Sequence, residues 1–204
     1  MATDAVRIRL PQVLVVDAGR DGEHLPPDLD AGVLLRDIDL SALIGLSLPR
    51  GTLVALDVDS IHGLRGDEAG VEFAFGRLGI GVIITRRPKT ASLVAEAGGL
   101  ALLQVMAYDS TGMARALDGH PGDGVGTVVS PGLVLAHMRP EELARLPRPV
   151  LAYGLIESPE DAMDALRSAD SIVIGSGPAN VLAEHLGPRP AFERNPLTTV
   201  AMQE

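Results

Sequence analysis

The feature of this sequence that most constrains its fold is a series of eight apolar runs of strand length. The runs are nearly continuous rather than alternating, which is typical of strands that are buried on both faces of a parallel sheet. Amphipathic segments such as DEAGVEFAFGRLG, KTASLVAEAGG and SPEDAMDALRSA separate several of them. In order, the runs are QVLVVDAG, AGVLLRDI, TLVALDVDS, GVIITRR, LALLQVMAYD, VGTVVSPG, PVLAYGLI and SIVIGSG.

Eight strand–helix units predict a small (β/α)8 barrel of the TIM type, and 204 residues lie near the lower size limit for that fold. The segment RDGEHLPPDLD contains two prolines and SALIGLSLPRG is short, so we expect a degenerate first helix and a short second helix. Ser158, followed by Pro159, predicts the start of a later helix. Because periodicity does not prove closure, an open doubly wound sheet is the alternative.

Composition limits the class of protein further. The hydrophobic content of 46% is sufficient for one core, and we expect a single domain over residues 1–204 with a loose tail at 188–204. The chain has no cysteine, which excludes a disulfide framework and a thiolate ligand or nucleophile. No apolar run has membrane-spanning length and no secretory signal is visible, so we expect a cytoplasmic protein without a membrane partner.

The net charge of −10 argues against a broad, sequence-independent grip on nucleic acid. A local contact through clustered cations is still compatible with that charge. The candidate cations form two groups, Arg86, Arg87 and Lys89 in one loop and Arg139, Arg145 and Arg148 around another.

In (β/α)8 barrels the functional groups lie at the carboxyl ends of the strands, and the turns after the seventh and eighth strands often bind phosphate. The sequences YGLI and GSGPAN fall at those two places. Glycine lets backbone N–H groups approach an oxyanion, and a serine hydroxyl can donate. The alternative is that these glycines only end strands and begin helices, but their position favours phosphate binding. The predicted phosphate ligands are Gly154, Leu155, Gly175, Ser176 and Gly177.

Acidic residues gather after the third apolar run. Asp57 and Asp59 are two residues apart on the expected strand, so we predict that they face the same way. Asp67 and Glu68 follow a glycine-rich loop, where they suit a helix cap. Together the four acids could instead bind Mg²⁺, and the sequence leaves open whether a metal is bound. His62 has no partner at metal-ligand spacing, so we interpret it as solvated.

Several longer segments carry a family resemblance: ALDVDSIHGLRGDEAGVEFAFGRLGIGVIITRR, LLQVMAYDS, VVSPGL, LAYGLIESPEDAMDAL and SIVIGSG. Over roughly residues 31 to 183 the chain resembles the glycerol-3-phosphate responsive antiterminator family, the glycerol uptake operon antiterminator regulatory proteins. The resemblance implies a small barrel that binds glycerol 3-phosphate and acts on leader RNA so that transcription reads through a terminator. The site positions that it implies are Asp59, Gly63, Asp67, Glu68, Thr85, Arg86, Gln104, Pro131, Gly132, Gly154 and Ile156.

The chain also departs from the pattern of that family. Asp57 stands where the family usually has histidine, and Val105 stands where an arginine usually follows the glutamine. A usual glutamate is replaced by Val129, or by Val128 if Ser130 is counted as aligned. The last strand ends in GSG rather than in a threonine-serine-asparagine type of sequence. The missing arginine removes a strong, bidentate type of phosphate contact.

Two functions follow from these observations. The first is a regulator without catalytic residues or cofactor, whose partners are glycerol 3-phosphate or a similar phosphate ester and, by weak or local contact, leader RNA. In it, Asp57, Asp59 and Arg86 face the polyol hydroxyls or each other. The alternative is an enzyme acting on a small phosphorylated substrate, with one of the acids as general base and Arg86 or Lys89 as electrophile. No lysine ends a strand, which weakens the enzyme hypothesis. Whether the chain forms a homodimer is open.

Overall fold

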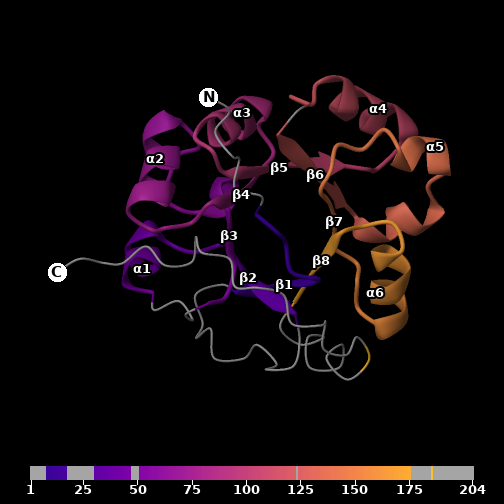
Figure 1. Cartoon of the computed structure of the whole chain (residues 1–204), viewed down its shortest axis with the longest axis horizontal. Helices are drawn as coiled ribbons and strands as arrows, with labels where there is room; N and C mark the ends of the chain where they lie inside the picture. Colours follow the sequence, from indigo (N-terminus) through magenta and orange to yellow (C-terminus); the bar gives the residue numbers. More distant parts are fainter. Residues whose placement is uncertain (1–7, 18–29, 47–50, 123, 176–184, 186–204) are drawn as a thin grey trace, which may run out of the picture.

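The computed structural model describes residues 8–17, 30–46, 51–122, 124–175 and 185. Eight parallel strands pair in chain order, and β8 pairs with β1, so the sheet closes into a barrel (Figure 1). The predicted (β/α)8 fold is thus confirmed. The strands are β1 (Val13–Asp17), β2 (Ala31–Leu35), β3 (Val54–Asp57), β4 (Val82–Thr85), β5 (Leu100–Met106), β6 (Val125–Ser130), β7 (Val150–Tyr153) and β8 (Ser171–Ile174).

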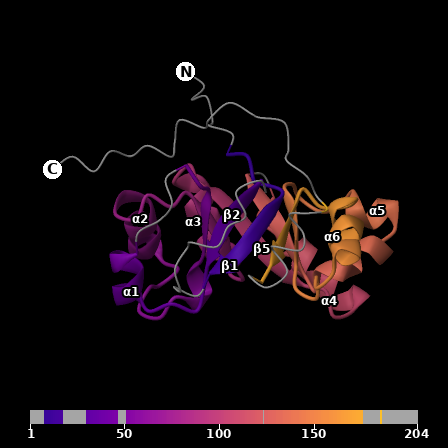
Figure 2. The same ribbon diagram turned by 90° about the horizontal axis from the view of Figure 1, so that it is seen from below.

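Helices cover the outside of the barrel, with α1 and α2 on one side and α5 and α6 on the other (Figures 1 and 2). The second helix, α1, has six residues and is short as predicted, while the segment expected to hold the degenerate first helix lies outside the described residues. The helical elements are α1 (Leu40–Gly45), η2 (Val58–Ser60), α2 (Glu68–Gly76), α3 (Pro88–Glu96), α4 (Ser110–Asp118), η3 (Gly132–His137), α5 (Pro140–Leu143) and α6 (Pro159–Leu166).

The start of α6 follows the sequence prediction. The Ser158 hydroxyl accepts from the Asp161 N–H at 3.1 Å, and the Asp161 carboxylate accepts from the Ser158 N–H at 3.0 Å. This reciprocal pair satisfies two N–H groups that the first turn of a helix leaves unpaired. None of the helices in the described part of the chain is long and apolar enough to cross a membrane.

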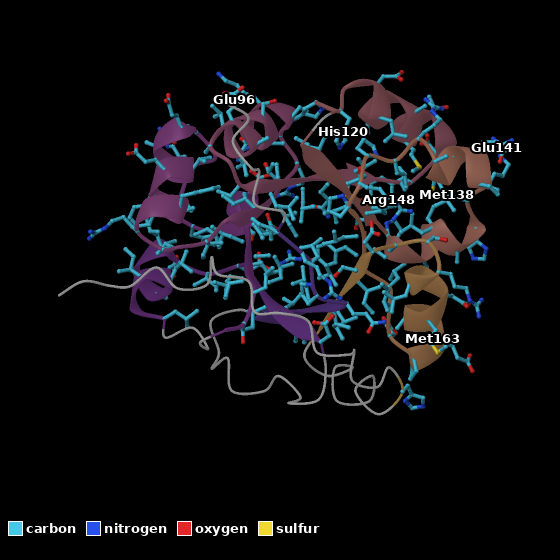
Figure 3. All side chains as sticks on the ribbon, viewed as in Figure 1. Glu96, His120, Met138, Glu141, Arg148 and Met163 are labelled. Carbon is cyan, nitrogen blue, oxygen red and sulfur yellow. The ribbon has the colours of Figure 1, made fainter. Side chains whose placement is uncertain are left out.

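Side chains fill the barrel interior and the space between barrel and helices (Figure 3). One buried apolar cluster takes residues from all eight strands and therefore forms the interior. Two further clusters pack the outer face of the sheet against the helices. The interior residues of β1 to β8 are Leu14, Leu34, Ala55, Val82 with Ile84, Leu102, Val128, Leu151 and Val173.

Strand alternation determines what lies at the mouth of the barrel. Side chains two residues apart on a strand point to the same face, so the residues two positions beyond the interior layer lie at the carboxyl end. These mouth positions are mostly polar, in contrast to the apolar layer beneath them. They are Val16, Arg36, Asp57, Arg86, Gln104, Ser130, Tyr153 and Gly175.

Candidate ligand site at the barrel mouth

Asp57 ends β3 and is buried at the mouth, with 4% of its surface exposed. Its Oδ1 atom is buried and has no hydrogen-bond partner among the described residues. Burial raises the pKa of Asp57, and the charges of Arg36 and Arg86 partly oppose that shift. A buried acceptor without a donor is costly, so Asp57 is suited to accept a hydrogen bond from a hydroxyl group of a ligand.

Asp59 does not lie on the strand with Asp57, which corrects the premise of the prediction from the sequence. The strand ends at Asp57, and the chain turns into η2, so the two-residue period no longer applies. The Asp59 side chain is 3% exposed, and its Oδ2 accepts from the Thr85 hydroxyl at 2.9 Å and from the Arg86 N–H at 2.6 Å. Through these two hydrogen bonds, Asp59 joins η2 to the end of β4.

Arg87 adds two further contacts to this connection between η2 and β4. Its Nη2 lies 3.0 Å from Oδ1 of Asp59, which is an ion pair by distance although its geometry does not qualify as a hydrogen bond. The Arg87 N–H also donates to the Thr85 hydroxyl at 3.1 Å. The candidate residues Thr85 and Arg86 therefore hold the β4 turn together, through the hydroxyl of Thr85 and the backbone N–H of Arg86.

Arg36 is a mouth residue that the reasoning from sequence missed. Its Nε donates to Oδ2 of Asp37 at 2.8 Å, and its guanidinium carbon lies 5.5 Å from the centroid of the Tyr153 ring. The signal that could have found it is strand parity, because Arg36 stands two positions after the interior residue Leu34. The sequence therefore contained a mouth arginine from β2.

The rim beside β2 and β3 is fixed by short hydrogen bonds. The Asp37 N–H donates to the Ser60 hydroxyl at 3.1 Å, and that hydroxyl donates to the Asp57 carbonyl oxygen at 3.0 Å. Asp37 itself has a φ of 55°, in the left-handed region. His62 is exposed, which agrees with its interpretation as a solvated residue. Its Nδ1 lies 3.7 Å from a carboxylate oxygen of Asp39.

The turns after β6 and β7 contact each other through their backbones. The Gly132 N–H donates to the Gly154 carbonyl oxygen at 3.0 Å. A Cβ at Gly132 would lie 2.6 Å from the Tyr153 nitrogen, so only glycine fits this approach. Pro131 precedes Gly132 and caps η3. This contact places the Pro131–Gly132 turn directly beside the predicted phosphate turn.

Two consecutive left-handed residues shape the turn after β7. Gly154 has a φ of 86° and Leu155 has a φ of 58°. This conformation is costly for leucine, and such strain is often stored where a protein binds a ligand. The Leu155 side chain is 60% exposed, so packing of that side chain does not explain the conformation.

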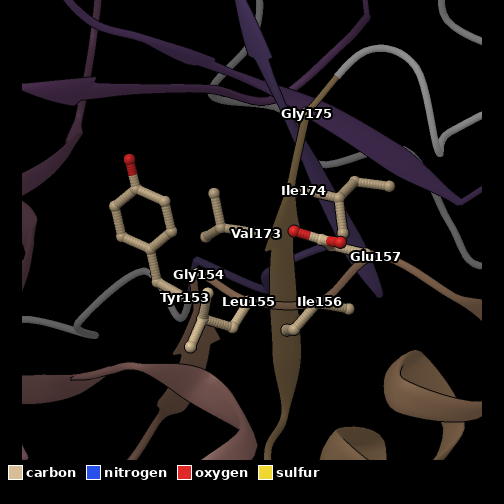
Figure 4. Close-up of a pocket in the computed structure, with 8 residues that line it drawn as sticks. All are labelled: Tyr153, Gly154, Leu155, Ile156, Glu157, Val173, Ile174 and Gly175. Carbon is tan, nitrogen blue, oxygen red and sulfur yellow. The ribbon is translucent and has the colours of Figure 1, made fainter.

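A pocket of about 450 Å³ lies between this turn and the end of β8 (Figure 4). In Figure 4, Gly154 and Leu155 stand beside Val173 and Ile174 of β8, and Gly175 follows the strand. Predicted phosphate ligands from both turns therefore line one pocket, while Ser176 and Gly177 lie outside the described residues. The lining residues are Tyr153, Gly154, Leu155, Ile156, Glu157, Val173, Ile174 and Gly175.

The remaining candidates lie apart from that pocket. Gln104 is half-buried on β5 at the mouth, and no described residue hydrogen-bonds its amide. Asp67 is the N-cap of α2 and accepts from the Gly70 N–H at 3.0 Å, while Glu68 is exposed in the first turn. Within the described ranges, no group of three or more His, Cys, Asp or Glu residues is arranged to hold a metal ion.

The structure also places the positions where the chain departs from the family pattern. Val105 and Val129 are buried in the core between the barrel and the helices. Val128 instead faces the barrel interior. None of these three apolar side chains can bind an anion, so the positive charge at the mouth comes from other strands.

The fold and the site define a (β/α)8 barrel whose carboxyl end carries a polar mouth and an adjoining pocket between the ends of β7 and β8. Residues 34–178 match the family described as glycerol-3-phosphate responsive antiterminator, and the chain belongs to that family. The resemblance stated from its sequence is therefore confirmed. No curated protein matches the chain.

Solved structures that are similar to this barrel include the following two. A glycerol uptake operon antiterminator-related protein from Thermotoga maritima MSB8 is 26% identical, with a TM-score of 0.72, over 86% of this chain and 99% of that protein. A glycerol uptake operon antiterminator regulatory protein from Listeria monocytogenes is 18% identical, with a TM-score of 0.66, over 83% and 96% of the two chains. The second similarity, at its low identity, supports the fold alone.

Proposed function

We propose that this chain binds glycerol 3-phosphate at the barrel mouth and regulates the antitermination of glycerol-utilisation transcripts. Membership of the antiterminator family supports the ligand and the output. The observation that carries the proposal is the buried Oδ1 of Asp57, which has no hydrogen-bond donor at the barrel mouth. The adjoining pocket is lined by Gly154 and Leu155, which both have a left-handed φ. A polyol phosphate has hydroxyl donors for the first feature and an oxyanion for the second.

The phosphate group is assigned to the pocket between the turns after β7 and β8. Glycines at positions 154 and 175 place no side chain between the backbone and the pocket, and Gly154 and Leu155 both have a left-handed φ, so this turn is suited to offer its N–H groups to an oxyanion. Ser176 and Gly177 extend this set from the sequence. Ile156, in contrast, is 5% exposed and supports the turn from the core.

The glycerol hydroxyls are assigned to the polar side of the mouth. Asp57 is an acceptor when ionised, and the half-buried amide of Gln104 can both donate and accept. Recognition of hydroxyls by a buried acceptor discriminates strongly, because a ligand without the hydroxyl leaves the acceptor unpaired. The mouth therefore suits a polyol phosphate better than phosphate alone.

The same geometry favours binding without turnover. Asp59, one of two general bases considered from the sequence, has its carboxylate engaged by Thr85, Arg86 and Arg87. Lys89, considered as an electrophile, is exposed in the first turn of α3, outside the mouth. A sensor needs neither group, and of the groups considered for catalysis only Asp57 and Arg86 remain available at the mouth.

A thermal-shift titration tests the proposal. A ligand that binds only the folded chain stabilises it in proportion to the logarithm of its excess over Kd. We expect glycerol 3-phosphate to raise the melting temperature, with much smaller effects from glycerol and from inorganic phosphate. The ligand recovered afterwards should be chemically unchanged. Absence of a shift with glycerol 3-phosphate at several millimolar would sink the proposal, and consumption of the ligand would favour an enzyme.

A further inference from the structure

The pocket at the ends of β7 and β8 has the wrong charge for an anion. Among its lining residues, Glu157 is the one side chain that is charged at neutral pH. A phosphate monoester carries between one and two negative charges there, so Glu157 repels it. Backbone N–H groups supply only partial positive charge. A full cation is needed close by, and it has to come from outside the lining.

Arg36 is the cation best placed for this role. Its guanidinium lies over the ring of Tyr153, and Tyr153 forms one wall of the pocket (Figure 4). The Arg36 side chain is 29% exposed, whereas Arg86 and Arg87 are 54% and 59% exposed and lie beside Asp59 instead. The planar guanidinium can stack on Tyr153 and still direct N–H groups toward an oxyanion.

Asp37 holds the same guanidinium. The 2.8 Å contact uses Nε of Arg36, and the Asp37 carboxylate is 58% exposed. Exposed ion pairs of this type are weak, so a dianionic group can displace Asp37. A phosphate that instead binds alongside Asp37 is repelled by it. Either way, Asp37 lowers the affinity for a phosphate ester.

We propose that Arg36 binds the phosphate group of the ligand and that Asp37 sets the affinity by competing for the same guanidinium. This inference rests on the proposed function, since it assigns the phosphate contact within that ligand site. It also accounts for the position of Arg36, which reaches past its own strand to the wall of the pocket.

Calorimetric titration of the full chain tests the inference with glycerol 3-phosphate, inorganic phosphate and glycerol. We expect Arg36→Gln to weaken the binding of both phosphates by about 10- to 100-fold and to leave glycerol unchanged, because only a charged hydrogen bond is lost. Arg36→Lys should recover part of the affinity, since it keeps the charge without the planar fork. Arg77→Gln, at an exposed arginine after α2, is the matched control and should change nothing.

Asp37→Asn tests the competition. Asparagine tolerates the left-handed φ of position 37, so the turn should be kept. We expect phosphate esters to bind up to about 5-fold more tightly to this variant, the scale of an exposed ion pair. The double variant of Arg36→Gln and Asp37→Asn should bind like Arg36→Gln alone, because the competitor has nothing left to hold.

The outcomes separate the two levels of the proposal. Normal phosphate-ester affinity in a folded Arg36→Gln variant overturns the role of Arg36 while leaving the proposed function intact. No gain of affinity in Asp37→Asn, or an equal gain without Arg36, overturns the competition. If the wild-type chain binds neither glycerol 3-phosphate nor inorganic phosphate, the proposed function and this inference both fail.

Discussion

The guanidinium of Arg36, which follows β2, lies over the ring of Tyr153 at the end of β7, 5.5 Å from its centroid. In the closed sheet β8 and β1 stand between these two strands. The contact therefore crosses one side of the mouth and places a positive charge next to the pocket and within electrostatic range of Asp57. A stacked cation of this type is worth about 0.5 to 2 kcal/mol.

Asp57→Asn should bind ligand more weakly and yet fold more stably at neutral pH. The folded pKa of Asp57 is raised by burial, so the folded protein holds this proton more tightly than the unfolded chain does. Stability from this group is therefore present at acid pH and is lost as the pH rises from about 3.8 through the raised pKa. Asparagine carries no charge to desolvate, so the variant gains stability while it loses ligand affinity. Such an exchange of stability for function is common at binding sites.

The measurement is urea unfolding of both proteins across the acid-to-neutral range, paired with glycerol 3-phosphate titration. The difference in unfolding free energy between Asp57→Asn and wild type should grow as the pH rises. A constant or shrinking difference would mean that the Asp57 carboxylate is adequately compensated by Arg36 and Arg86. Glu68→Gln is the control, since Glu68 is exposed at the start of α2.

Most of the fold was predictable from the sequence, because parallel strands that are buried on both faces leave unbroken apolar runs. Every one of the eight predicted runs contains a strand of the barrel. Closure was not predictable, because the pairing of β8 with β1 depends on strand tilt and register rather than on local pattern.

The site was less predictable, and Asp59 shows why. Two-residue alternation holds only while the strand continues, and the turn of η2 right after Asp57 carries Asp59 to different partners. Arg36 shows the opposite error. Its register from Leu34 was readable, but its contact with Tyr153 joins strands far apart in sequence and becomes visible only once the barrel is closed.

Gly154→Val and Gly175→Val should both lose binding of phosphate esters. At Gly154 the left-handed φ also makes valine strained, so we expect a stability loss of about 1 to 2 kcal/mol there. Leu155→Gly is the informative comparison, because it keeps the backbone N–H and removes the strain. It should bind normally and change stability by less than about 1 kcal/mol. Normal binding by a folded valine variant would mean that its glycine serves packing only.

Asp59→Ala should destabilise the protein by about 2 to 3 kcal/mol, because it deprives Thr85 and the Arg86 N–H of a charged acceptor. Asp37→Ala, which breaks an exposed ion pair, should cost less than about 1 kcal/mol. Denaturant unfolding of the two variants checks the contrast. Equal losses of unfolding free energy would show that the buried Asp59 stabilises the fold no more than the exposed Asp37 does.

His120 should make the fold sensitive to mild acid. Its Nδ1 accepts from the Gly122 N–H at 3.1 Å, and burial lowers its pKa, opposed by the contact of Nε2 with the Gly126 carbonyl oxygen. Because the folded pKa is below the ordinary 6.5, stability from this group is present above that pH and is lost as the pH falls below it. Urea midpoints of His120→Gln should depend less on pH than those of wild type. His62→Gln, at an exposed histidine, should behave like wild type.

The last prediction concerns leader RNA, the target that an antiterminator family implies. We expect the isolated protein to bind such RNA weakly at physiological salt, since the net charge of −10 repels the phosphate backbone. The local cations are also partly neutralised. Arg87 pairs with Asp59, Arg139 lies 2.7 Å from Glu142, and Arg148 lies 2.7 Å from Asp170.

Lys89, Arg145 and Arg86 are the cations that could still add to RNA affinity, because Lys89 and Arg145 are exposed and Arg86 approaches Asp59 only at 3.7 Å. Recognition of RNA by splayed bases and stacking needs fewer phosphate contacts than duplex binding, so a specific contact of low salt dependence is compatible with this charge. The measurement is the affinity for glycerol-operon leader RNA over a salt series, with and without glycerol 3-phosphate. A shallow slope, lowered further in Arg145→Gln, is expected. Tight binding with a steep slope would show that a gathered basic face outweighs the acidic charge. No binding under any condition would leave either a sensor whose partner is a protein or an enzyme.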